Sequence, residues 1–267
     1  MSKMYTDAHR LVVQAFLARG VMDEKDVKSL VHTACERCGV PNVGERVDNF
    51  IHQINSQLHK MAMEIKKKRE EEDGAQVYAL VQTAEHQIGK IINNYSPKEL
   101  ELFKEIVSKV ITSENGEVSS TDCLNLADAL ERRITKDEAQ NAVKKFVEER
   151  WLRIDEEGQI SLAARGIMEL QMFLQEKYSD FIVTCYLCQD IVVKGQLCDG
   201  CGKVKLHNFC AQRLFQTRPN PKCPACEVNW SHDIPHLNGG PVEETSLVTM
   251  DPSQPSTSGR RKRGTRR

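Results

Sequence analysis

Apolar residues recur at helical spacing three times within the first sixty positions of the chain. This spacing predicts helices over residues 5–19, 23–38 and 42–56, because residues three and four positions apart share one face of a helix. After the third helix, apolar residues alternate with polar ones on both sides of the charged run KKKREEEDG. Alternation of this kind predicts two strands joined by a long charged turn.

The same order of elements recurs in the next stretch of chain. Ser96-Pro97 predicts a helix start, and Thr135 with Glu138 predicts a capping box. Alternating residues on both sides of Asp-Glu-Glu-Gly at 155–158 predict a hairpin. The predicted helices cover residues 97–112, 119–131, 135–149 and 163–177. Three helices followed by a hairpin is the order of a winged-helix domain. We therefore predict a mostly α fold with small β-wings, with winged-helix domains at 1–95 and 96–180.

Composition narrows the functional classes without selecting one. The formal net charge of −1 provides no bulk attraction to nucleic acid or to an anionic membrane. No apolar run approaches the roughly 18 residues that a membrane span requires, and the first residues lack the apolar core of a secretory signal. We therefore expect no membrane association, and a reducing compartment in which thiols stay free to bind metal.

Beyond Trp230 the apolar periodicity stops. Residues 231–267 are rich in Pro, Ser and Thr and end in GRRKRGTRR, which predicts a disordered basic tail. Such an ending is consistent with a nuclear localisation signal, with a loose nucleic-acid contact, or with a solvated tail that has neither role.

Eight potential metal ligands fill residues 185–226, and they are the most specific feature of the chain. Their pattern is C-x2-C-x9-C-x2-C-x5-H-x2-C-x12-C-x2-C. Each pair separated by two residues can direct both side chains at one metal ion, and four pairs complete two tetrahedral sites. We therefore predict two zinc ions in closed structural sites, without catalytic residues. The ligands are Cys185, Cys188, Cys198, Cys201, His207, Cys210, Cys223 and Cys226.

Two assignments of these ligands to two metal ions compete. In the sequential assignment each ion binds four consecutive ligands, and in the cross-brace successive ligand pairs alternate between the two ions. The cross-brace explains why a His-x2-Cys pair lies between two cysteine pairs and is followed by a 12-residue loop. We therefore assign one site to Cys185, Cys188, His207 and Cys210. The second site is then Cys198, Cys201, Cys223 and Cys226.

A cross-brace with this ligand set, expected over residues 181–230, resembles a variant RING finger or a PHD finger. Ligand spacing alone does not separate the two, but neighbouring side chains do. RING fingers that recruit a ubiquitin-conjugating enzyme usually carry an aliphatic residue before the second cysteine and a proline inside the last pair. Leu187 and Pro224 occupy those positions. PHD fingers usually carry an aromatic residue where this chain has Pro221, so the side chains favour RING.

Over residues 1–230 the order of domains resembles the non-SMC element one family, the RING-like subunits of the SMC five–six complex. This resemblance implies a nuclear, chromosome-associated ubiquitin ligase subunit in DNA damage repair and recombination. It also implies a MAGE-family protein, a kleisin-type subunit and the SMC complex as partners. The alternatives from other classes are a PHD-like reader of histone tails and a purely structural, zinc-braced subunit.

A RING ligase acts by holding a ubiquitin-loaded conjugating enzyme in a reactive orientation. The residues expected to contact that enzyme are Leu187, Pro224, Leu214 and Phe215. Many active RING fingers carry a basic residue shortly after the last cysteine, whereas this chain carries Glu227. We therefore expect ligase activity that depends on a partner.

Two further features favour ordinary packing or protein docking. Cys35, Cys38 and His32 have no fourth ligand nearby, and Cys123 lies in an apolar helical stripe, so we expect both groups to pack. The predicted helix at 135–149, with Arg150 beyond it, carries four basic and four acidic residues and no surplus charge for phosphates. We therefore expect protein docking and no direct DNA binding by this chain.

Overall fold

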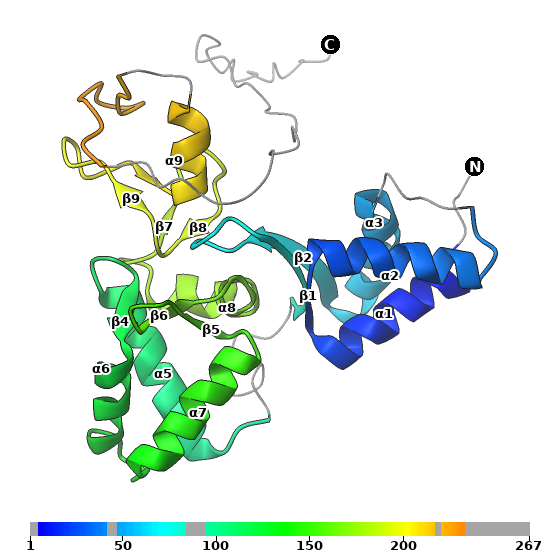
Figure 1. The fold of residues 1–267 in the computed structure, drawn as a ribbon, viewed down its shortest axis with the longest axis horizontal. Coiled ribbons are helices and arrows are strands. Elements are labelled where there is room, and N and C mark those ends of the chain that lie inside the picture. The colour runs from blue at the N-terminus through cyan, green and yellow to red at the C-terminus, as the bar shows by residue number, and fades with distance from the viewer. Residues whose placement is uncertain (1–4, 42–46, 84–93, 217–219, 233–267) are drawn as a thin grey trace, which may run out of the picture.

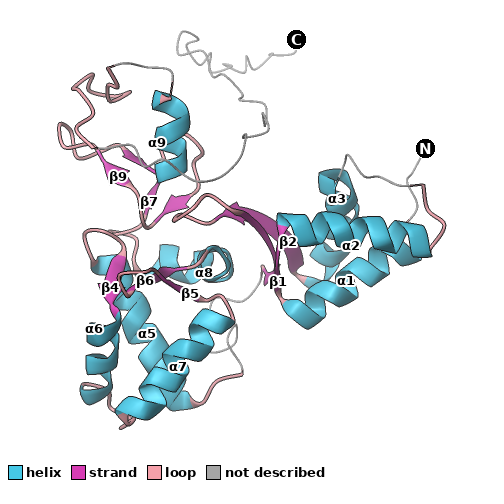
Figure 2. Ribbon diagram, in the orientation of Figure 1, coloured by secondary structure: helices cyan, strands magenta, loops and turns pink. Residues whose placement is uncertain are grey.

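A computed structural model describes residues 5–41, 47–83, 94–216 and 220–232. Within this part, helices and small antiparallel sheets form three groups, and the hairpin β2–β3 reaches from the first group to the junction of the other two (Figure 1, Figure 2). None of the described helices is both long and apolar enough to cross a membrane. The predicted disordered tail lies outside the described residues, except for 231 and 232.

The first group packs three helices on a three-stranded sheet. The helices are α1 (Asp7–Arg19), α2 (Glu24–Arg37) and α3 (Val47–Leu58), and a 3-10 turn (His59–Met61) follows α3. The strands β1 (Val21–Asp23), β2 (Met63–Arg69) and β3 (Gln76–Gln82) pair in the order β1-β3-β2. The predicted start of the third helix, 42–46, lies outside the described residues. Alternation does not predict β1, because three residues are too short for it to register.

The second group repeats this plan with shorter strands. Its helices are α5 (Pro97–Thr112), α6 (Ser120–Asn125), a 3-10 turn (Leu126–Asp128), α7 (Lys136–Glu148) and α8 (Ala164–Lys177). Its strands β4 (Glu117–Ser119), β5 (Leu152–Ile154) and β6 (Gln159–Leu162) pair in the order β4-β6-β5. The two predicted helix starts are confirmed: Ser96 and Thr135 each cap a helix and receive the side chain of the glutamate three residues on. The winged-helix assignment and the domain boundaries stay predictions.

The hairpin β2–β3 packs on both of its faces, most completely along β3. Tyr78 and Ile65 pack into the core beneath α1–α3, and Asn55 in α3 exchanges two hydrogen bonds with the backbone of Ile65, at 2.8 and 2.9 Å. On the other face, alternate residues of β3 pack against Ala164 and Met168 of α8. Alternate residues of the strand therefore pack against α1–α3 on one face and against α8 on the other. This packing fixes the sheet of the first group to the last helix of the second.

The charged turn of this hairpin lies between the other two groups of elements rather than in solvent. Glu70 and Glu71 are only 2% and 4% exposed. Glu70 accepts a hydrogen bond from the backbone N–H of Ala164 at 2.8 Å, and Asp73 pairs with Arg153 of β5 at 2.8 Å. Nothing in the charge pattern predicted this burial, since neighbouring acidic residues ordinarily stay hydrated.

The cysteine-rich segment forms the third group, with very short strands around one helix. Strands β7 (Val183–Thr184) and β8 (Ile191–Val192) pair, as do β9 (Gln196–Leu197) and β10 (Lys205–Leu206), and α9 spans Asn208–Phe215. Its few core residues pack among the cysteines. Gly116, which precedes β4 of the second group and has φ +73°, lies so close to this third group that an added Cβ would be 2.5 Å from the Val193 oxygen. Only glycine therefore allows this approach of the second group.

Candidate metal centre

Three of the four ligand pairs lie on the same kind of turn. The first cysteine of each pair accepts, through its carbonyl, a hydrogen bond from the backbone N–H four residues on, at 2.8 to 3.0 Å. Those closing residues are Gln189, Gly202 and Glu227, and all three have φ near +60°. A left-handed residue at this position turns the chain back, so that both cysteine side chains point into the turn.

The fourth pair uses a helix instead of a turn. His207 is the N-cap residue of α9, and Cys210 lies in its first turn. The carbonyl of His207 accepts a hydrogen bond from the N–H of Ala211 at 2.9 Å. Helical spacing therefore brings the imidazole and the thiol to the same end of the helix.

The structure gathers the eight side chains into two sets of four. One set is Cys185, Cys188, His207 and Cys210, and the other is Cys198, Cys201, Cys223 and Cys226; in each, the ligand atoms lie within 4.8 Å of one another. These are the two sets that the cross-brace assignment predicted. Among the described residues no other cluster of metal-ligating side chains is found.

The spacing of the donor atoms fits a tetrahedral metal ion. The Sγ atoms of Cys198 and Cys226 are 3.7 Å apart, and those of Cys201 and Cys223 are 3.9 Å apart. Metal–sulfur bonds of about 2.3 Å in a tetrahedron place sulfur atoms about 3.8 Å apart. With four protein donors in each set, both clusters can hold a metal ion and leave no position for water or substrate.

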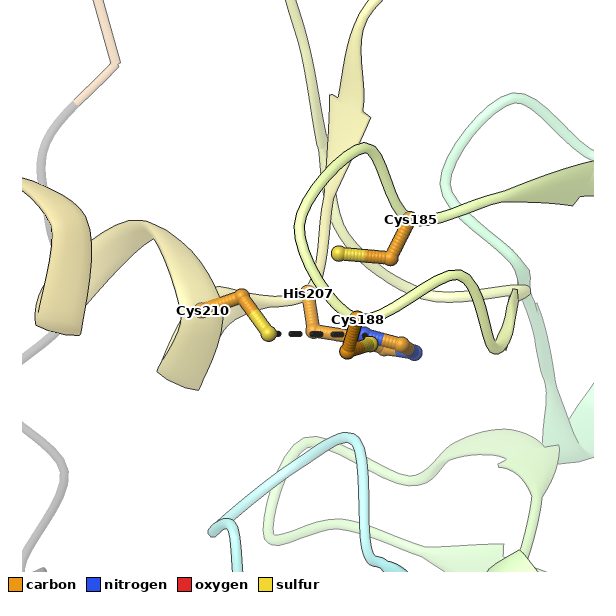
Figure 3. Close-up of side chains that lie close together, drawn as sticks. All are labelled: Cys185, Cys188, His207 and Cys210. Atoms are coloured by element: carbon orange, nitrogen blue, oxygen red, sulfur yellow. Dashed lines mark hydrogen bonds between the residues drawn. The ribbon is translucent and has the colours of Figure 1, made fainter. Parts of the chain in front are cut away.

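His207 faces the first cluster through one ring nitrogen (Figure 3). Its Nδ1 lies 3.3 Å from the Cys188 sulfur and 3.8 Å from the Cys210 sulfur. On the other edge of the ring, Nε2 lies 3.0 Å from the Ile191 carbonyl oxygen and 3.3 Å from Oε1 of Glu71. Two acceptors at Nε2 hold the proton there, which leaves Nδ1 free to bind a metal ion.

The same contacts determine how readily His207 carries a positive charge. Burial by itself lowers the pKa of this imidazole, but hydrogen bonds with Cys185, Cys188 and Glu71 outweigh burial and raise the pKa to about 11. Nδ1 would hold a metal ion in place of the second proton, and the ion would supply the positive charge that the thiolates and Glu71 favour.

The residues expected to contact a conjugating enzyme fall into two groups. Leu187 is 37% exposed, Pro224 is exposed and Leu214 is half-buried. Phe215, by contrast, is 2% exposed and packs against Trp230 with ring centroids 5.2 Å apart. Phe215 therefore lies in the core of the module and has almost no area to offer a partner.

Two residues near the clusters acquire roles that sequence reasoning missed. Glu227 occupies the left-handed position that closes the last cysteine turn, so this position has a structural requirement besides its charge. Glu71 contacts His207 from a hairpin more than a hundred residues earlier. A left-handed residue after C-x2-C can be sought in sequence, but no local signal connects Glu71 to His207.

The isolated cysteines lie apart from both clusters. Cys35 is buried in α2 and Cys38 is its C-cap residue, and neither belongs to a metal-ligating group. Cys123 is fully buried, and this burial raises the pKa of its thiol to about 12. Cys123 is therefore a core residue, not a reactive thiol, as the apolar stripe predicted.

Comparison with known proteins agrees with both parts of this description. A family model described as the Nse1 non-SMC component of the SMC5-6 complex matches residues 9–170, and a RING-like domain model matches residues 185–226. The human non-structural maintenance of chromosomes element 1 homolog is 38% identical over 245 residues, 91% of each chain. The Schizosaccharomyces pombe protein of that name is 23% identical over 229 residues, 85% of this chain and 93% of that one. A chain of a solved Nse1-Nse3-Nse4 complex, 35% identical, superposes with a TM-score of 0.78 and covers 88% of this chain and 100% of that one.

Proposed function

The chain belongs to the Nse1 family of non-SMC components of the SMC5-6 complex, and we propose that it serves there as a zinc-dependent, RING-type ubiquitin ligase subunit. One observation carries the proposal: an exposed aliphatic residue, Leu187, and an exposed proline, Pro224, stand on loops of the two different metal clusters. A cross-brace that holds both loops rigidly provides the kind of surface that a conjugating enzyme recognises.

Zinc is the metal that we propose for both clusters. Three thiolates with one imidazole, and four thiolates, are soft donor sets that favour zinc in a tetrahedron. Zinc would supply the folding free energy of the module and no chemistry, because all four ligand positions are protein atoms. The cysteine turns and α9 then hold Leu187, Pro224 and Leu214 in place.

The proposed mechanism is catalysis by positioning. Leu187, Pro224 and Leu214 would bind the conjugating enzyme, so that the ubiquitin thioester carbonyl is presented to an acceptor lysine in a fixed orientation. The proton transfers and the thioester belong to the conjugating enzyme and its substrate, so this chain needs no acid, base or nucleophile of its own. Glu227 supplies no positive charge toward ubiquitin, which favours activity that increases with a bound partner.

We propose a MAGE-family protein, a kleisin-type subunit and the SMC complex as partners, with a nuclear, chromosome-associated role in DNA repair and recombination. The solved relative named the Nse1-Nse3-Nse4 complex supports such an assembly. Protein docking is favoured over DNA binding because cations of the second group are already engaged. Arg150 pairs with Asp23 at 2.8 Å, Lys144 with Glu148 at 3.7 Å, and Lys145 lies over the ring of Tyr95.

An in vitro ubiquitination assay with the reconstituted complex tests the ligase proposal. Leu187→Ala should lower the rate of ubiquitin chain formation roughly tenfold, since truncating a central interface contact commonly costs more than 1 kcal/mol. Leu197→Ala is the matched control, because Leu197 is exposed in the same module on β9. Equal rates for wild type, Leu187→Ala and Pro224→Ala would refute a RING-type contact at these residues.

A purely structural subunit is the second candidate, and a specific observation favours it. Lys194 of the module contacts both other groups, pairing with Glu72 and with Glu117 at 2.7 Å each. In that case, removing zinc would disassemble the complex, and no conjugating enzyme would bind the intact complex at any concentration tested. Measured binding of a conjugating enzyme that is weakened by Leu187→Ala would exclude it.

A further inference from the structure

We propose that Glu71 is a positioning residue for the first metal cluster, and that the N-terminal hairpin thereby controls how firmly this cluster holds its metal. The proposal rests on the metal content proposed above but not on ligase activity. It connects a residue of the first helical group to a ligand 136 positions later in the chain.

The carboxylate of Glu71 is held in one orientation. Its Oε1 accepts a hydrogen bond from the N–H of Val193 at 3.0 Å, and its Oε2 accepts one from the N–H of Lys194 at 2.8 Å. With both oxygens fixed by backbone donors, Oε1 also lies 3.3 Å from Nε2 of His207. The side chain is 4% exposed, so water does not compete for these contacts.

This geometry is that of a carboxylate behind a metal-bound imidazole. A proton kept on Nε2 selects the tautomer whose Nδ1 can bind metal, and the negative charge makes that nitrogen a stronger donor. The rest of the hairpin reinforces the arrangement. Nζ of Lys68 donates to the Ile191 oxygen at 3.1 Å, the same oxygen that faces Nε2 of His207.

The two residues after Glu71 hold the turn against the module and against the second group. Glu72 pairs with Lys194 at 2.7 Å, and Asp73 pairs with Arg153 at 2.8 Å. Departure of the hairpin therefore removes the charged one of the two acceptors at Nε2 of His207 and leaves only the Ile191 carbonyl, and loss of the imidazole position removes a partner from the hairpin. Coupling of this kind is reciprocal: metal binding stabilises the docked hairpin as much as the docked hairpin stabilises metal binding.

The second cluster provides an internal reference. In the described part of the chain, hydrogen bonds to its ligand sulfurs come from within the cysteine-rich module. Its metal retention should therefore not depend on residue 71. One protein thus contains a cluster tied to the hairpin and a cluster independent of it.

The experiment follows zinc release from the 267-residue chain to a chromogenic chelator. In Glu71→Gln, one of the two zinc equivalents should leave roughly tenfold faster than in wild type, because such partners commonly change metal affinity by 10–100-fold. Glutamine keeps the size of the side chain but removes its charge, and its amide group cannot accept from both backbone N–H groups. The other equivalent should leave at the wild-type rate.

Glu72→Gln is the matched control, since it weakens hairpin docking through Lys194 without touching His207. It should accelerate release of the first equivalent less than Glu71→Gln does, and it should leave the release rate of the other equivalent unchanged. Cobalt substitution provides a second measurement, because cobalt absorption depends on the donor strength of the ligands. Glu71→Gln should shift the absorption bands of the first cluster, the three-sulfur, one-nitrogen site, whereas a merely structural role of Glu71 would leave them unchanged. Glu71→Asp, which keeps the charge and shortens the reach, serves as the second variant if Glu71→Gln folds poorly.

Equal acceleration of both equivalents, or equal effects of Glu71→Gln and Glu72→Gln, would overturn the proposal in favour of general loosening. Wild-type release rates in both Glu71 variants would overturn it as well. A wild-type chain that binds no zinc would remove the proposed cofactor together with this inference. Loss of ubiquitin transfer in the Leu187 variant assay has no bearing on either result.

Discussion

The two candidate metal clusters belong to one eight-residue ligand pattern but differ in what surrounds them. The first, built around His207, faces the hairpin of the first helical group through Glu71 and Lys68. The second, built from four cysteines, is surrounded by residues of its own module, including Val228 packed on Gly200. The first cluster lies at the junction of all three groups of elements, whereas the second stabilises its own loops.

This difference indicates that metal binding would have two distinct consequences in one small module. Loss of the first ion would release contacts that reach the rest of the chain, while loss of the second would unfold local turns. The distinction matters for interpreting ligand substitutions. Substituting a ligand of the first cluster would change the arrangement of the three groups of elements as well as the proposed surface for the conjugating enzyme.

Removing one ligand from each cluster should separate these consequences most strongly. Cys188→Ser should increase hydrogen exchange at residues 70–73 and 191–194, because structural zinc contributes about 10 kcal/mol of folding free energy in small modules. Cys201→Ser should increase exchange only within the module, near the second cluster. Hydrogen-exchange mass spectrometry of both variants checks this, and matching exchange at residues 70–73 would contradict the comparison.

Breaking the junction without touching a ligand should have an intermediate effect. Lys194 lies 2.7 Å from the carboxylates of both Glu72 and Glu117, and its side chain is 18% exposed. Lys194→Met leaves Glu117 mostly buried without its cation, at a cost of about 1–3 kcal/mol once partial exposure is discounted. Thermal unfolding should show a fall in Tm of several degrees, while Lys203→Met, exposed in the same module, should change Tm little.

The smallest effect is expected from the charge of Glu70. Burial, partly offset by the hydrogen bond from Ala164 and by Arg153 and Arg150, raises the pKa of this carboxyl. A raised folded-state pKa means that the folded protein binds the proton more tightly than the unfolded chain does. The contribution of Glu70 to stability therefore falls as the pH rises from the ordinary carboxyl pKa through the raised value.

Glu70→Gln should accordingly gain stability relative to wild type as the pH rises through that window. The difference in Tm between variant and wild type, measured from pH 4.5 to 7, isolates Glu70 from metal ligands that titrate in both proteins. A difference that is constant with pH would show that the junction does not hold this carboxyl in the way that its burial indicates.

Local signals predicted much of the fold. The capping residues Ser96 and Thr135 start helices where expected, because a side-chain oxygen and a nearby backbone N–H are enough to define a helix start. The short strands β1 and β4 were missed, since three residues carry no measurable alternation. Their pairing with β3 and β6 depends on a partner strand supplied from elsewhere in the chain.

In the candidate site, too, some features were predicted from the sequence and others depend on packing. Ligand spacing predicted which four residues of each set come together, because a C-x2-C turn and a cross-brace leave few alternative pairings. Spacing did not predict that Phe215 is buried, since a helical apolar residue can face a core or a partner equally well. Only packing against Trp230 decides this.

The amino-acid sequence by itself determined the local chemistry of this protein: its caps, its hairpins and two sets of soft metal ligands. Tertiary structure alone decided that an acidic turn in the first half is buried against a candidate metal ligand in the second. The physical reason is that the contacts of a carboxylate depend on which donors the fold places beside it. In this chain the backbone N–H groups of Val193 and Lys194, together with His207, are supplied by a segment more than a hundred residues away.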